Sequence, residues 1–187
     1  MAETADPRPL PPASAARAPA AGGGAGVARA RLAFEAGNSG WLLPLEDSGE
    51  VLPVPTIERV PLTRSWFLGA ANVRGVIYGV TDWAAFVGAG PSARGPENRL
   101  LLIGQRFALN VALLVARVGG LRSVAELAPA AARADLPWAH RAWRDAQGML
   151  WQELDAGVLL QRTDFLEVAR AEAARHGAHP ARDTPWH

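Results

Sequence analysis

Short alternating runs of apolar residues, separated by turn residues, recur along most of this chain, which is the pattern of β-strands rather than of long helices. Leu32 and Phe34 stand two positions apart, and residues 37–40 (Gly-Asn-Ser-Gly) predict a turn into a second strand at residues 41–43 (Trp-Leu-Leu). Residues 50–52 are expected to continue the same sheet. The chain is therefore predicted to begin its ordered part with a β-sheet.

The segment from Val73 to Thr81 is apolar on both faces, as in a strand buried within a closed sheet. The residues before it, up to Asn72, are expected to form a loop, and Asp82 can cap a one-turn helix that Gly88 ends. Arg74 lies where the loop becomes the strand, on a face where a solvated arginine is not normally placed. Two interpretations are open: an arginine salt-bridged at the rim of the sheet, or one held ready for a partner.

Further strands and one insertion are predicted downstream. Gly88 to Pro96 predicts a turn-rich loop, because the element that follows it, Arg99 to Ile103, has the pattern of a strand and not of a dinucleotide-binding helix. Phe107 to Val118 alternates large and small residues, which predicts a strand in a curved sheet, and Met149 to Asp155 predicts the last strand. Residues 125–146 are alanine-rich and are interpreted as a variable insertion with helical spacing.

The predicted domain organisation is one domain with two tails. Residues 1–29 are rich in alanine, proline and glycine and are expected to be disordered, whereas residues 30–170 are expected to form the domain. Asp164 to Glu167 is a capping box for a helix expected to run to about Arg175, and residues 171–187 should be its end and a frayed tail. Many short strands with one terminal helix indicate a mainly β protein, either a barrel or a sandwich.

Composition removes several kinds of chemistry. All 19 basic residues are arginine and cysteine is absent, which excludes Schiff-base and phosphate-loop lysines, thiol nucleophiles and disulfides. A net charge of +1 gives no electrostatic footprint for nucleic acid. The N-terminus lacks a secretory signal and the longest apolar stretch is too short to span a bilayer, so we expect a cytoplasmic protein with no membrane insertion.

The remaining polar residues predict no catalytic, metal or cofactor site. His176 and His179 have helical spacing, but they lie in the predicted fraying tail, which cannot supply a second shell for a metal. No serine has a histidine nearby in the sequence, so a hydrolase would need a pocket that brings His140 beside a serine.

The seven tryptophans form two groups. Four lie in the predicted sheet or its loops and are expected to be mainly core: Trp41, Trp66, Trp83 and Trp151. Three lie where the pattern does not decide whether the chain is ordered, and would be candidate protein contacts if exposed: Trp138, Trp143 and Trp186.

Three blocks, in this order, resemble the signature of CheW-like domains. They are Glu50–Pro53 with the later Val60-Pro61, then Asn72-Val73-Arg74-Gly75 with the strand and Ala-Ala-Phe-Val-Gly after it, then Ala112–Leu121. The resemblance extends from about Leu32 to Leu159. It implies a fold of two small five-stranded β-barrels that share a core, with short helices that include a C-terminal one.

The resemblance also implies a function. CheW-like adaptors are not enzymes; they connect the cytoplasmic tip of a methyl-accepting chemoreceptor to the CheW-like regulatory domain of a CheA-type histidine kinase, in arrays at the membrane. Glu50 and Arg74 match positions that contribute to these contacts in the family. Asn72 is expected to orient the loop through its side-chain amide, and Gly75 to let a partner backbone approach.

Within the family, the pattern of Gly148 to Ala169 and the block around Arg74 are most similar to members that serve type IV pili and twitching motility. Adaptors of flagellar chemotaxis are the alternative within the family. Outside the family, a small barrel that binds single-stranded nucleic acid is a remote alternative. The sequence lacks the interleaved basic and aromatic residues of the groove that such binding needs.

Overall fold

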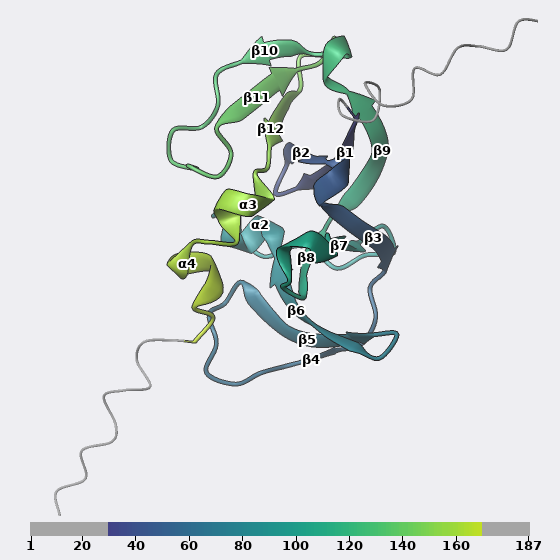
Figure 1. The fold of residues 1–187 in the computed structure, drawn as a ribbon, viewed down its shortest axis with the longest axis vertical. Helices are drawn as coiled ribbons and strands as arrows, with labels where there is room; N and C mark the ends of the chain where they lie inside the picture. Colours follow the sequence, from purple (N-terminus) through teal and green to yellow (C-terminus); the bar gives the residue numbers. More distant parts are fainter. Residues whose placement is uncertain (1–29, 170–187) are drawn as a thin grey trace, which may run out of the picture.

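Two six-stranded β-sheets, stacked one above the other, make up the protein (Figure 1). The computed structural model describes residues 30–169. Its mainly β architecture confirms the predicted fold class, with six strands in each sheet where the resemblance implies five-stranded barrels.

The first sheet, sheet A, combines the two ends of the described chain. In spatial order it contains β10 (Ala128–Ala130), β11 (Arg141–Arg144), β12 (Leu150–Glu153), β2 (Ser39–Pro44), β1 (Ala30–Ala36) and β9 (Arg117–Ser123). All pairs are antiparallel except β12 with β2, which is parallel. Gly37 and Asn38, with φ of +58° and +59°, form the predicted turn between β1 and β2.

The second sheet, sheet B, is built from the middle of the chain. In spatial order it contains β3 (Ser48–Pro53), β7 (Arg99–Ile103), β8 (Val111–Val115), β6 (Val76–Asp82), β5 (Phe67–Val73) and β4 (Ile57–Glu58). Its only parallel pair is β6 with β8. The strand of residues 50–52 therefore belongs to sheet B, and the prediction that it continues the first sheet is wrong, because its partner β7 is about fifty residues away in the chain.

Three other predictions of elements are wrong. Residues 67–72 form β5 instead of a loop, and the single strand expected over Phe107–Val118 is divided into β8 and β9 by a break at Ala116. Residues 125–146 hold β10 and β11, besides the 3-10 turn η3 (Val124–Glu126), because β12 provides a sheet edge for them. The alanine-rich composition concealed this pairing, which is set by contacts outside the segment.

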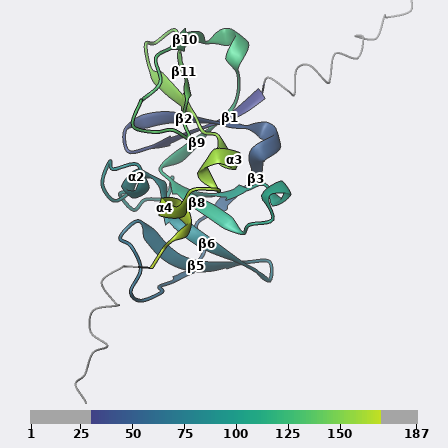
Figure 2. The same ribbon diagram turned by 60° about the vertical axis from the view of Figure 1, so that its left-hand side comes forward.

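Three one-turn helices lie at the junction of the two sheets, as Figure 2 shows: α2 (Trp83–Phe86), α3 (Ala156–Leu159) and α4 (Thr163–Leu166). The Asp82 carboxylate caps α2, accepting from the Ala85 amide at 3.3 Å, as predicted. The predicted C-terminal helix is shorter than expected: α4 ends at Leu166, and Asp164 pairs with Arg162 at 2.7 Å instead of capping it. The rest of that prediction lies outside the described residues, as do the tail predictions for residues 1–29 and 171–187.

The junction contains one shared hydrophobic core. Its buried side chains come from both sheets and from α2, α3 and α4. Tryptophans 41, 83 and 138 form its centre: the Trp41 and Trp83 rings lie 5.1 Å apart, and Trp138 lies 5.0 Å from Trp83. Trp138 is only 3% exposed, so it belongs to the core and does not meet the condition for a candidate protein contact. None of the helices in the described part of the chain is long and apolar enough to cross a membrane.

Asp145 is the centre of a small set of polar contacts in sheet A. Its carboxylate accepts hydrogen bonds from the Trp151 indole at 2.9 Å and from the Met149 amide at 2.9 Å, and Arg122 lies 3.6 Å away. These contacts, with the Trp151 hydrogen bond first, lower the pKa of Asp145 below its ordinary value of 3.8.

Asp145→Asn is expected to lower the thermal midpoint at pH 7 and to reduce the dependence of stability on pH. A carboxyl group whose pKa is lowered on folding contributes stability above its ordinary pKa and loses it as the pH falls through the folded-state value. The difference in thermal midpoint between the variant and the parent chain should therefore become smaller as the pH falls from 5 to 2, measured by thermal unfolding. Glu97→Gln, at an exposed site, is the control; a gap that stays constant with pH would contradict this role.

Candidate functional site

A tight hairpin turn carries three of the four predicted site residues. β5 and β6 pair up to Val73 and Val76, which leaves Arg74 and Gly75 as a two-residue turn with φ of +52° and +86°. Positive φ at both central positions is the geometry of a type I′ turn, whose twist matches that of the strands. The Asn72 side-chain oxygen accepts a hydrogen bond from the Gly75 amide at 2.8 Å, which closes the turn.

The prediction that placed Arg74 on a buried strand is therefore wrong. Its side chain is 79% exposed and projects from the turn. An arginine at a left-handed position is uncommon, so residues 74–75 do not have an ordinary turn signal such as Asn-Gly. Around Gly75 no atom lies within 4 Å of where a β-carbon would be, so space is open beside the turn.

Glu50 on β3 completes the site. The Arg74 guanidinium donates two hydrogen bonds to it, from Nη1 to Oε2 and from Nη2 to Oε1, both at 2.7 Å. In sheet B the strands β7 and β8 lie between β3 and the β5–β6 hairpin in hydrogen-bonding order. The ion pair thus joins distant parts of sheet B, which shows how strongly that sheet curls, and it brings together the two charged residues that the sequence singled out.

Exposed apolar residues lie beside the ion pair. Val76 is 41% exposed and Ile77 is 56% exposed, although the sequence predicts both to be buried. Val76 lines a hollow of about 260 Å³ together with residues that include Glu50, Arg74 and Tyr78. We call Glu50, Asn72, Arg74, Gly75, Val76 and Ile77 the β5–β6 corner. Sequence reasoning missed its two apolar members, because the exposure of residues beside a turn can be predicted only when the turn itself is recognised.

A buried carboxylate lies where the chain passes from β2 of sheet A to β3 of sheet B. Asp47, at the end of the 3-10 turn η1 (Leu45–Asp47), is 4% exposed and pairs with Arg106 on the 3-10 turn η2 (Gln105–Phe107). Burial raises the pKa of Asp47, although the Arg106 charge acts in the opposite direction. The Gly104 amide also donates to the Asp47 carbonyl oxygen at 2.7 Å, so this contact holds η2 close to the corner, where Gln105 lines the hollow.

The hydrolase alternative finds no residues to support it in the described part of the chain. His140 lines a separate hollow of about 230 Å³ with charged residues such as Arg31 and Glu153, and no serine lines it. The buried Arg31 and Glu153 pair at 3.2 Å. The two histidines weighed as metal ligands, at positions 176 and 179, lie outside the described residues, as does Trp186.

Comparison with known proteins gives consistent results. A family model described as CheW-like domain matches residues 31–164. Protein PilI of Pseudomonas aeruginosa is 27% identical over 143 residues, covering 74% of this chain and 79% of that protein. The crystal structure of the scaffolding protein TtCheW from Thermoanaerobacter tengcongensis matches with a TM-score of 0.60 and 18% identity, covering 73% of this chain and 94% of that one. The region matched by the family model contains the strands of both sheets, except Ala30, and the whole β5–β6 corner.

Proposed function

The chain belongs to the CheW-like domain family, and from this premise we propose that it is a non-catalytic chemosensory adaptor that couples a methyl-accepting receptor to a CheA-type histidine kinase. In this role it acts in the cytoplasm at receptor arrays. The single observation that carries the proposal is the β5–β6 corner, where Arg74 and Glu50 meet on an exposed surface beside apolar side chains.

The geometry of the corner suits the docking of a partner helix. The Arg74 guanidinium gives one N–H from each of Nη1 and Nη2 to Glu50, which holds the planar group in one orientation. Its remaining N–H donors, including Nε, can bind a partner carboxylate. Less rotational freedom is then lost when a partner binds. Val76 supplies apolar area in the same hollow as the charges, and the open space at Gly75 leaves room for a partner backbone.

We further propose that the pathway is the one that controls type IV pili and twitching motility. The name of the relative PilI supports this, as does the sequence pattern of Gly148 to Ala169. A flagellar chemotaxis adaptor is the second candidate, because the corner would serve either pathway equally.

Reconstitution tests both levels of the proposal. The purified chain should form a ternary complex with a CheA-type kinase and a receptor cytoplasmic fragment, measured by co-sedimentation of the three components. The pilus-system pair from the same organism should bind more tightly than the flagellar pair. A preference for the flagellar pair would change the pathway alone, whereas failure to bind any receptor or kinase would refute the adaptor role.

A further inference from the structure

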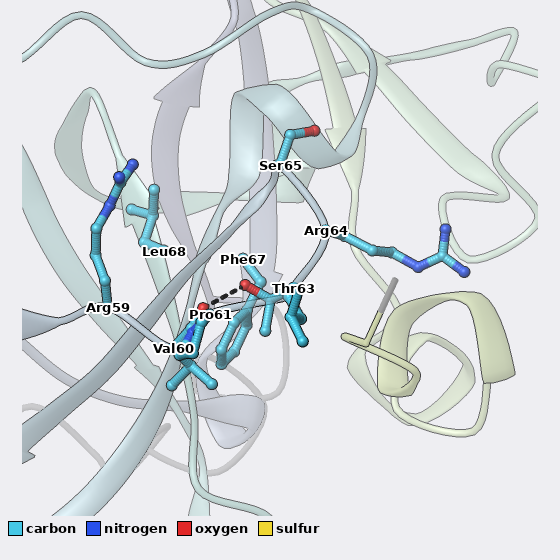
Figure 3. A pocket seen from close by; sticks show the side chains of 9 residues that line it. Arg59, Val60, Pro61, Thr63, Arg64, Ser65, Phe67 and Leu68 are labelled. Carbon is cyan, nitrogen blue, oxygen red and sulfur yellow. Dashed lines mark hydrogen bonds between the residues drawn. The ribbon is translucent and has the colours of Figure 1, made fainter. Parts of the chain in front are cut away.

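A groove in sheet B, away from the β5–β6 corner, has no role in the proposed function. It has a volume of about 460 Å³ and is lined by residues 59–65 with Phe67 and Leu68. These residues connect β4 to β5, and we call this surface the β4–β5 groove. Figure 3 shows Arg59 and Arg64 on opposite sides of it, with Val60, Thr63 and Phe67 between them. The β5–β6 corner lies at the other end of β5, which has seven residues, so about 20 Å separates the two surfaces.

The two arginines of the groove are free of ion pairs. Eight other arginines in the described part of the chain pair with a carboxylate, whereas neither Arg59 nor Arg64 does. Arg64 uses its Nε to donate to the Glu167 carbonyl oxygen at 2.9 Å, which leaves its two terminal guanidinium nitrogens available to a partner. Among the described residues, no acidic side chain lines the groove, so this lining carries a positive charge.

Leu62 is exposed at the rim of the groove in a strained conformation. Its φ is +59°, a left-handed value that leucine rarely adopts, and its side chain is 68% exposed. It follows Pro61 in a tight turn, at a position where glycine or asparagine is favoured. Val60, next to the turn, is 45% exposed. A strained backbone that presents a large apolar side chain to water indicates a functional constraint, because neither packing nor local preference explains it.

The back of the groove is held by the C-terminal part of the described chain. The Arg64 amide donates to the Val168 carbonyl oxygen at 2.8 Å, and Thr63 forms an isolated antiparallel bridge with Ala169. The Thr63 hydroxyl donates to the Val60 carbonyl oxygen at 2.9 Å, which fixes the turn from within (Figure 3). The groove is therefore a preformed surface and binding should need little rearrangement.

We propose that the β4–β5 groove is a docking site for a segment of a partner protein that carries an apolar side chain between two carboxylates. The carboxylates pair with Arg59 and Arg64, and the apolar side chain lies against Leu62 and Val60. Charge complementarity selects this occupant, because two unpaired guanidinium groups flank an apolar centre. The inference rests on the groove alone and does not depend on the adaptor role.

Selection from a phage-displayed library of random dodecapeptides tests the proposal. The library is selected on the full chain and counter-selected on the triple variant Arg59→Glu, Leu62→Ser, Arg64→Glu. We expect enriched peptides to share an apolar residue with aspartate or glutamate on both sides. Absence of enrichment, or enrichment of peptides without acidic residues, would overturn the proposal.

Single variants then locate the binding site of an enriched peptide. Arg59→Glu and Leu62→Asn should each weaken binding at least tenfold, whereas Arg94→Glu and Leu121→Asn, at exposed positions elsewhere, should change it less than twofold. Because asparagine tolerates the left-handed conformation, Leu62→Asn should also raise the thermal midpoint, so loss of binding cannot be attributed to unfolding. Equal losses in the control variants would refute the site, as would arginine-dependent binding of anionic lipid vesicles or single-stranded DNA in place of the peptide.

Discussion

Arg74→Glu is expected to weaken binding of the receptor fragment about 30-fold or more, which corresponds to roughly 2–5 kcal/mol for a charged contact that becomes buried on docking. The substitution removes the guanidinium fork and places two carboxylates at the β5–β6 corner. The thermal midpoint should fall by no more than about 4 °C, because an exposed ion pair contributes about 0–1 kcal/mol to folding. Co-sedimentation and thermal unfolding measure the two effects on the same preparation.

The chain offers a matched control for this substitution. Arg117 is 62% exposed and pairs with Glu35 at 2.7 Å on sheet A, so Arg117→Glu breaks a similar surface pair away from the corner. It should leave binding unchanged. The exchange Glu50→Arg with Arg74→Glu restores an ion pair of opposite direction, and it should not restore binding if Arg74 itself meets the partner. Full recovery by the exchange would show instead that the pair only braces the fold, and the site assignment would be wrong.

Trp138→Ala is expected to destabilise the protein by about 3–5 kcal/mol, with a fall in thermal midpoint of about 6–20 °C. Its ring lies 5.0 Å from Trp83 and 5.7 Å from Trp41, so removal leaves a cavity among aromatic rings that cannot close around it. This is a large fraction of the stability of an ordinary domain. Chemical denaturation at 25 °C gives the free energy directly.

The size of this loss of stability shows whether residues 125–146 contribute to the core or form a surface insertion. In a variable surface insertion, the same substitution would cost less than about 0.5 kcal/mol. Trp138→Phe keeps an aromatic ring in the core and should lose less than Trp138→Ala. If the alanine and phenylalanine variants were both as stable as the parent chain, the shared core described above would be incorrect.

Local signals predicted the parts of the fold that depend on neighbouring residues. The capping of α2 by Asp82 and the strand Arg99–Ile103 follow from the order of polar and apolar residues over a few positions, and both are confirmed. The turn before β2 was equally readable, since Gly37 and Asn38 tolerate positive φ. These elements need no distant partner to be recognised.

The parts that sequence reasoning missed depend on distant contacts. The β5–β6 hairpin was hidden because its turn contains arginine, and β10 and β11 were hidden because alanine-rich strands resemble a helix until β12 is known to lie beside them. For the candidate site, the motif around Arg74 identified the charged residues, but the ion pair with Glu50 and the exposure of Ile77 depend on how sheet B curls.

The order of strands has a consequence for how the protein is made. Sheet B is formed by one continuous stretch, residues 48–115. In sheet A, the second edge of β2 is covered only by β12, which lies more than a hundred residues later in the chain. A polypeptide that leaves the ribosome before Leu150 would contain every strand of sheet B, but β2 would have an uncovered edge and the shared core would lack α3 and α4. Truncated chains are therefore expected to expose an unpaired strand edge, which is a template for pairing with other chains.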